Sequence, residues 1–464
     1  MGATSAAELS PAVEHMLGEA IMEQGRHDPT YVAALDINQY LTGVGRRLAA
    51  HAPQALSQPI TVFAIRDPSI NAFALPGGYI GVNSGLVVGA QSESELASVL
   101  AHEIGHVMQR HIARGIAHES QGTGMMVASL VGALLAALAG QGDLAMGVAA
   151  FGQAATIDRQ LGFSRSAEQE ADRAGFQMMR AAGFDPRGML DMFRRLMNAA
   201  SLNEGTGGAY ASTHPLSIQR LSDIENRLSE LPPVQVRPDP EFWFVRTRLA
   251  LLQAVSGDSR RNLQQSLRNE AGTQQGMRKS AALYGLAMLD RQSGDIAGAR
   301  SYVAQAQALQ DSPQLAMLAI QLAAAQSPAA AEEVSAAAWK RWPDSQGVAD
   351  GRAHALQAAG RDQQAVAFLQ ARIRQWPDVP EFQKSLADGL NRLGRMAEAH
   401  EAMASYYEQT GALPTAVEHL EQARKLSRDF YVQSKLDARI RQVREHLKTQ
   451  RALLAPYRNK SDGQ

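Results

Sequence analysis

The chain of 464 residues contains no cysteine. Disulfide bonds, cysteine-ligated zinc and a thiol nucleophile are therefore excluded. The absence of cysteine does not determine the cellular compartment, because a chain without thiols suits reducing and oxidising surroundings alike. Aromatic residues are also scarce, at 6%, while alanine and leucine are abundant. This composition favours helices over sheets.

An excess of either charge is missing as well. The 45 Lys and Arg residues against 46 Asp and Glu residues give a net charge of −1. This balance lacks the excess of positive charge that is typical of proteins that bind nucleic acids. The length indicates two or three domains rather than one core.

The first residues, 1–8, lack the basic and apolar regions of a signal peptide. We expect either a cytoplasmic protein or a periplasmic one whose signal peptide has been removed, and the polar, Ala/Ser-rich start favours the second. A long hydrophobic run is missing too. The most apolar stretch, Met125–Ala139, is shorter than the roughly 20 residues that span a bilayer. This stretch is expected to form a buried helix; alternatively, residues 121–155 form a segment that shields a cleft or faces a membrane.

The pattern of apolar residues predicts a helical N-terminal half with a few strands. Strands are expected at 60–66, 72–75 and 79–83, the last two joined by the turn Pro76-Gly77-Gly78. The remaining elements are expected to be helices at 9–52 (two helices), 93–119, 168–182, 185–200 and 214–230.

Four prolines in residues 231–240 mark a change of composition. We place a domain boundary there, giving one domain at 1–232, a second at 233–455 and a disordered tail at 456–464. The second domain is repetitive. Gly294, Gly360 and Gly394 each precede an alanine by five residues, and the tetrapeptides at 341–344 and 375–378 share Trp-Pro-Asp at a spacing of 34. This period resembles that of the tetratricopeptide repeat, which implies an α-solenoid with a protein-binding surface. A generic alanine-rich helical bundle is the alternative.

His102 and His106 are the residues that point most directly to chemistry. On a helix they are separated by about 6 Å of rise and 40° of rotation, so both imidazoles leave one face. Zinc binds neutral imidazole nitrogen, and a catalytic zinc site keeps one position for water. Glu103 is offset from His102 by about 100°. From there its carboxylate can take a proton from zinc-bound water and pass it to the leaving amine.

A third ligand must come from another helix, because position 112 is Ile and no third histidine completes an extended motif. On spacing alone Glu168 and Glu170 are both possible. Glu168 is preferred, since it shares a helix face with Asp172. His111 and His118 are interpreted as surface histidines, because His111 should face away from the metal and His118 lies too far along the helix.

The whole motif set resembles the membrane-linked gluzincin family, which includes the CAAX prenyl endopeptidase and HtpX. The resemblance covers about residues 30–230 and rests on these segments: His102-Glu103-Ile104-Gly105-His106, Glu168-x-x-Ala171-Asp172, Asn71–Ile80, Ser164-Arg165, and Thr213-His214-Pro215 with Arg220. It implies one Zn²⁺ per chain, held by His102, His106 and Glu168. Glu103 would be the general base and acid, and Asp172 would accept the remaining N–H of a ligand histidine.

The resemblance also implies roles for residues outside the motif. The strand formed by Asn71, Ala72, Phe73, Ala74 and Leu75 would present its edge to an extended substrate. His214 would approach the metal and make the resting enzyme self-inhibited. Transition-state stabilisation by His214 or Arg220 is a competing role, and a capping His-Pro turn is a third interpretation.

The expected fold is mainly α with a small β-sheet, a zincin-like metallopeptidase domain followed by an α-solenoid of tetratricopeptide repeats. The resemblance implies a periplasmic zinc endopeptidase that degrades unfolded or stalled outer-membrane proteins. The repeats would recruit the substrate or the outer-membrane assembly machinery. Two alternatives remain: a chaperone or adaptor with a normally closed zinc site, and a cytoplasmic peptidase with a repeat docking domain.

Overall fold

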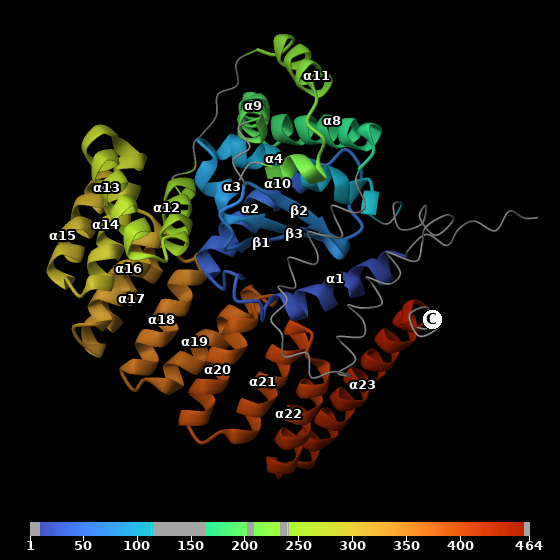
Figure 1. The fold of residues 1–464 in the computed structure, drawn as a ribbon. Coiled ribbons are helices and arrows are strands. Elements are labelled where there is room, and N and C mark those ends of the chain that lie inside the picture. The colour runs from blue at the N-terminus through green and yellow to red at the C-terminus, as the bar shows by residue number, and fades with distance from the viewer. Residues whose placement is uncertain are drawn as a thin grey trace, which may run out of the picture. The chain divides into compact units, whose positions relative to one another are not determined.

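A computed structural model describes residues 10–112, 114, 163–201, 208–232, 239 and 241–458. The expected apolar segment 121–155, His118 and residues 459–464 lie outside these ranges. The chain divides into two compact units, one up to Leu263 and one from Gln264 to Ala455 (Figure 1). Among the described residues, no helix is both long and apolar enough to cross a bilayer.

The first unit contains a three-stranded sheet within its described part. Its order is β1 (Thr61–Ile65), β3 (Tyr79–Asn83), β2 (Ala72–Leu75), with β1 parallel and β2 antiparallel to β3. All three strands were predicted from the sequence. The predicted turn also holds, because Gly77 and Gly78 have φ of 82° and 85°, a backbone region that favours glycine.

Nine further described elements of this unit are helices. They are α1 (Pro11–Gly25), α2 (Leu35–Ala49), α3 (Ser84–Gly89), α4 (Glu93–Met108), α8 (Arg165–Ala181), α9 (Arg187–Ser201), α10 (Gly208–Thr213), α11 (Ile218–Ser229) and α12 (Glu241–Gln253). Side chains alternate across the sheet, as strand geometry requires. Phe63 and Phe73 join the apolar cluster of α1, whereas Val62 and Ile80 join the larger core with α2 and α4. Figure 1 shows α1 on one side of the sheet and α4 with α8 on the other.

Helix α4 is buried along almost its whole length. It begins at the N-cap Ser92, whose hydroxyl accepts a hydrogen bond of 3.1 Å from the Glu95 N–H. The helix predicted over 93–119 is too long, because α4 ends at Met108. The chain turns at Arg110, whose φ of 53° is left-handed and cannot continue a right-handed helix.

Helices α4 and α8 approach each other closely because glycines lie at their contact. A Cβ on Gly105 would come within 2.9 Å of the Ala171 Cα, and a Cβ on Gly175 within 3.1 Å of the Ala101 carbonyl carbon. These small residues bring the backbone of α8 against that of α4 beside the two histidines.

The second unit is a succession of helices in adjacent pairs, from α13 (Gly257–Thr273), which contains the division between the units, to α23 (Phe430–Arg458). Between these lie α14 (Gly276–Ser293), α15 (Ile296–Leu309), α16 (Pro313–Ala324), α17 (Pro328–Arg341), α18 (Gln346–Ala358), α19 (Asp362–Gln375), α20 (Pro380–Arg392), α21 (Met396–Thr410) and α22 (Leu413–Leu426).

The residues that revealed the repeat have a structural role in this unit. Gly294, Gly360 and Gly394 have φ of 88°, 70° and 72° in the turns between paired helices. Ala299, Ala365 and Ala399 are buried in the helices that follow, where small side chains let paired helices pack closely. The mainly α fold class, with a small sheet and an α-solenoid, is thereby confirmed.

The division between the compact units falls beyond the proline-rich residues 231–240. Helix α12 packs on the first unit, where Arg248 forms an ion pair with the buried Asp36 on α2. Arg246 Nε donates to the Val88 carbonyl at 3.0 Å, and Gln253 Nε2 donates to Ser84 Oγ at 2.7 Å. The domain boundary at 232/233 stays a prediction.

Candidate metal centre

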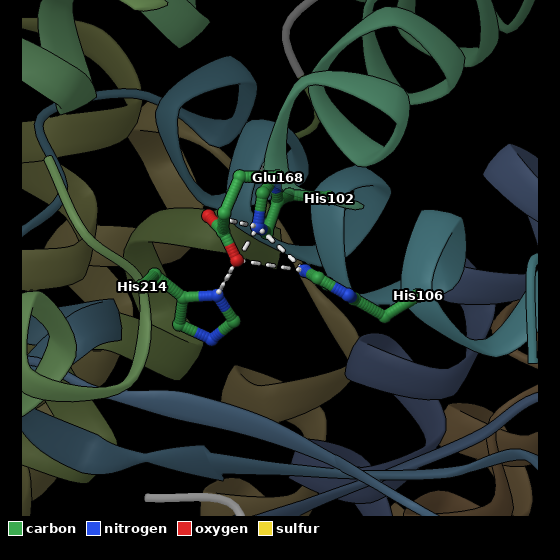
Figure 2. A group of neighbouring side chains, drawn as sticks. All are labelled: His102, His106, Glu168 and His214. Carbon is green, nitrogen blue, oxygen red and sulfur yellow. Dashed lines mark hydrogen bonds and ion pairs between the residues drawn. The ribbon is translucent and has the colours of Figure 1, made fainter. Parts of the chain in front are cut away.

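Four buried side chains from three segments converge in the first unit. His102 and His106 come from α4, Glu168 from the first turn of α8, and His214 from the residue after α10 (Figure 2). One potential ligand atom from each lies within 4.8 Å of all the others. The sequence predicted all four residues, and it also preferred Glu168 over Glu170.

The distances between these atoms fit a single zinc ion. The Nε2 atoms of His102 and His106 are 3.0 Å apart. Glu168 places Oε1 3.4 Å from His106 Nε2 and Oε2 3.5 Å from His102 Nε2. Two ligand atoms on one tetrahedral zinc, each at about 2.0–2.1 Å, are about 3.3 Å apart. The donor set and its spacing therefore suit Zn²⁺.

His214 lies where a fourth ligand would be. Its Nδ1 is 3.3 Å from His102 Nε2 and 3.1 Å from Glu168 Oε1. Its Nε2 is 3.5 Å from Glu103 Oε1, and both side chains are fully buried. Burial lowers the pKa of His214, so the imidazole is neutral and its nitrogen can act as a ligand.

The Nδ1 atom of His102, which is the far nitrogen because it lies on the side of the ring away from the cluster, contacts a buried carboxylate. Asp172 Oδ1 is 2.9 Å from His102 Nδ1, and Arg220 donates to the same carboxylate from Nε at 2.7 Å and Nη2 at 2.8 Å. Burial opposes ionisation of Asp172, but the hydrogen bonds from Arg220 and His102 outweigh it and lower its pKa to about 2. The charge on Asp172 favours hydrogen on Nδ1, which leaves Nε2 free to bind a metal.

Arg220 joins this carboxylate to Glu168 of the cluster. Its Nη1 is 2.6 Å from Glu168 Oε2, and the residue is only 4% exposed. Burial opposes the charged form of His102, but hydrogen bonds to Asp172 and Glu168 outweigh it and raise the pKa of His102 to about 10. A metal cation would take the place of that proton, because a histidine must be deprotonated to bind it.

The far nitrogen of His106 contacts another histidine. His111 Nδ1 lies 2.8 Å from His106 Nδ1, and His111 is only 7% exposed. The prediction that His111 is a surface residue is therefore wrong. It assumed an unbroken helix, whereas the left-handed turn at Arg110 returns the chain toward His106. Burial and, to a smaller extent, the charge of Arg114 lower the pKa of His111 to about 4.

Two aromatic residues that the sequence did not indicate complete the site. The ring of Tyr210 on α10 stacks on His214 with centroids 4.5 Å apart. Phe163 stacks on His106 at 4.0 Å and on His214 at 5.6 Å. Tyr210 precedes His214 by four residues, a spacing that a helix places on one face. Phe163 has no comparable signal.

The strand nominated for substrate binding lies beside α4. Within the described sheet β2 is an edge strand, and all four of its side chains are buried. Asn71 comes just before it, and the Asn71 carbonyl accepts a hydrogen bond of 3.0 Å from the Asn83 N–H. A cavity next to this strand is lined by Leu17, Leu75 and His106, among other residues.

Comparison with known proteins identifies this region. Residues 36–228 match the model of peptidase family M48. This part of the chain is a peptidase family M48 domain. The resemblance to metallopeptidases is therefore confirmed at the level of the M48 domain. This domain contains all the converging side chains described above.

Several known proteins are similar to this chain over part of its length. The beta-barrel assembly-enhancing protease of Escherichia coli is 31% identical over 288 residues, which is 62% of this chain and 58% of that protein. The protein of that name from Yersinia pestis is 32% identical over 252 residues, 54% of this chain and 51% of its own. The mitochondrial metalloendopeptidase OMA1 of Schizosaccharomyces pombe is 40% identical over 183 residues, 39% of this chain and 50% of its own. The matches span about half of these relatives.

The solved structures that resemble this chain are helical-repeat proteins, and their similarity to it is low. Yeast Tom70 has a TM-score of 0.30 at 11% identity, covering 79% of this chain and 88% of that one. A chain of the Cut9–Hcn1 assembly has a TM-score of 0.26 at 15% identity, covering 62% of this chain and 59% of that one. Scores at this level support no inference about function.

Proposed function

We propose that the protein is a zinc-dependent endopeptidase that cleaves unfolded or stalled outer-membrane proteins in the periplasm. The observation that carries this proposal is the convergence of four buried ligand atoms beside Glu103 within an M48 domain. The names of the bacterial relatives, assembly-enhancing proteases for β-barrels, support the choice of substrate.

His102, His106 and Glu168 would hold one zinc ion per chain. When bound, zinc supplies Lewis acidity, which polarises a peptide carbonyl and lowers the pKa of water. Asp172 would orient His102 by accepting its Nδ1–H. Arg220 would orient both carboxylates, since it contacts Glu168 and Asp172 together.

Glu103 would act as the general base and acid. Its helical position next to His102 brings its carboxylate to the side of the metal ligands, with Oε1 3.5 Å from His214 Nε2. There it would accept the proton of the attacking water and return it to the amine of the leaving peptide. No covalent bond to the protein is needed.

The substrate would bind as an extended chain along β2, over residues Asn71–Leu75. An edge strand offers backbone N–H and C=O groups to an added strand. Because β2 packs against α4, an added strand would run past Glu103 and the histidines. The cavity beside Leu75 and His106 would accept a side chain of that substrate.

His214 would keep the resting enzyme closed. Three features support this role: its Nδ1 lies at the fourth ligand position, it is fully buried, and its ring stacks between Tyr210 and Phe163. Opening would separate these rings and free the position for water.

The competing role for Arg220, direct stabilisation of the transition state, has less support because its guanidinium is already engaged by two carboxylates. The competing role for His214 predicts the opposite change on mutation. If His214 closes the site, His214→Ala increases cleavage of an unfolded substrate. If it stabilises the transition state, His214→Ala decreases cleavage.

The repeat unit would recruit the substrate or the outer-membrane assembly machinery, as solenoids of paired helices commonly bind proteins. A chaperone or adaptor with a permanently closed zinc site is the second candidate. The burial of His214 over the site favours it, because no ligand position is free in this arrangement.

Cleavage of an unfolded outer-membrane β-barrel protein decides between the two candidates. Wild type and Glu103→Gln are compared at equal zinc content and with equal thermal unfolding midpoints. The proposal expects cleavage by wild type and a loss of at least about 100-fold in the variant. Absence of cleavage by wild type and His214→Ala, with equal protection of the substrate by wild type and Glu103→Gln, would show a chaperone.

A further inference from the structure

His111 contacts a metal ligand from the side opposite the metal. Its Nδ1 is 2.8 Å from Nδ1 of His106, whereas the Nε2 of His106 belongs to the converging cluster. The ring centroids are 4.9 Å apart at 67°, an edge-to-face arrangement that allows a hydrogen bond between the two Nδ1 atoms. His111 therefore contacts the ring nitrogen of His106 that lies outside the cluster, and His111 is not itself a member of the cluster.

The backbone is specifically shaped to bring His111 to this place. Arg110 adopts a left-handed φ of 53°, a conformation that costs an L-residue about 1–2 kcal/mol. Arg110 is held by Glu14 on α1, whose Oε1 accepts from Nε at 3.1 Å and from Nη2 at 2.8 Å. The residue at the turn is thus also bonded to another helix through its side chain.

The direction of the hydrogen bond follows from metal binding. A histidine that binds a metal through Nε2 carries its hydrogen on Nδ1, and that N–H needs an acceptor. For His106 the acceptor within reach is the lone pair of His111 Nδ1. His111 then carries its own hydrogen on Nε2, which faces Glu170 Oε2 at 3.6 Å. The three groups are thus connected by a hydrogen bond at the first contact and by a longer ion-pair contact at the second.

We propose that His111 is a positioning residue for the metal site. It fixes the ring orientation and the tautomer of His106 by accepting the Nδ1–H of that ligand, and Glu170 in turn orients His111. The inference rests on the proposed zinc site, and it assigns His111 and Glu170 a role that touches neither the metal nor the substrate.

Two substitutions separate this role from simple packing. His111→Asn keeps an acceptor near the place of Nδ1, whereas His111→Leu fills a similar volume without one. The zinc dissociation constant of the full-length chain, measured by competition with a chromophoric chelator, is the readout. Loss of such an outer contact typically weakens metal binding by about 10–100-fold.

We expect His111→Leu to raise the zinc dissociation constant by about 10–100-fold, while His111→Asn stays close to wild type. His51→Leu is the matched control, because His51 is an exposed histidine of the same unit, and it should leave the constant unchanged. Thermal unfolding of the metal-free proteins checks the fold. If His111→Leu does not fold, His111→Gln replaces it, since its amide lies nearer the place of Nε2.

Two results would overturn the inference: zinc affinity of folded His111→Leu equal to wild type, or an equal loss in His111→Leu and His111→Asn. Failure of the proposed function looks different. In that case wild type itself binds no zinc, or binds zinc without cleaving any unfolded substrate that Glu103→Gln leaves intact.

Discussion

The two histidines of α4 are four residues apart, yet their far nitrogens are held in different ways. Asp172 contacts His102 and is in turn bound by Arg220 of α11, so this side consists of buried charges. A neutral histidine, His111, contacts His106, and its partner Glu170 is about half exposed. One side of the centre is ionic and buried, whereas the other has a buried neutral histidine followed by a partly exposed carboxylate.

This difference predicts how each side responds to mutation. Removing one member of a buried ion pair leaves an uncompensated charge, which costs about 3–5 kcal/mol. Removing a neutral acceptor would leave the buried Nδ1–H of His106 without a partner, which costs about 1–3 kcal/mol. Substitutions on the ionic side should therefore lower both the free energy of unfolding and the zinc affinity. Substitutions on the neutral side should lower mainly the zinc affinity.

Asp172→Ala is expected to have the largest effect. It leaves Arg220 buried without its principal partner, so the free energy of unfolding should fall by about 3–5 kcal/mol. Denaturant unfolding of the metal-free chain measures it. Asp223→Ala is the control, because Asp223 also pairs with an arginine, Arg227, but both are partly exposed, and less than about 1 kcal/mol is expected. Equal losses in the two variants would contradict the comparison.

Gly105→Ala is expected to disturb both sides together. Its new methyl group would meet the α8 backbone at Ala171, and such overpacking typically costs about 1–3 kcal/mol. Because Glu168 and Asp172 are both on α8, zinc affinity should fall as well, as measured by chelator competition. In Gly272→Ala the added methyl group meets nothing within 4 Å. This control should be neutral or stabilise by about 0.4–1 kcal/mol, and a loss equal to that of Gly105→Ala would refute the packing argument.

Ser92→Ala is expected to have the smallest effect of the three. It removes the N-cap of α4, which typically lowers the free energy of unfolding by about 1 kcal/mol. Zinc affinity should not change, because neither far nitrogen is involved. A clear loss of zinc affinity would mean that stability alone, rather than the contacts of the two histidines, determines metal binding.

Local patterns predicted a large part of this molecule. The strands follow from their β-branched and aromatic residues, the turn at residues 76–78 from its two glycines, and the paired helices from glycine and alanine at a fixed period. His102, His106 and Glu168 could also be brought together, since helix geometry and the chemistry of zinc limit the options.

What the sequence missed depends on contacts between distant residues. The end of α4 was misjudged because the left-handed Arg110 is held by Glu14, 96 residues earlier. His111 was therefore placed on the surface, although it contacts His106. In the same way, the packing of α12 on the first unit rests on Asp36 and Arg248, which no local pattern connects.

A crystal structure of the full-length chain loaded with zinc, with anomalous diffraction at the zinc edge, tests the central claim most directly. The account predicts one zinc ion per chain, with His102 Nε2, His106 Nε2 and a Glu168 oxygen at about 2.0–2.2 Å. His214 Nδ1 should be the fourth ligand, and His111 should accept the hydrogen bond from His106 Nδ1. Absence of zinc from this cluster, or a zinc ion bound by other residues, would contradict it.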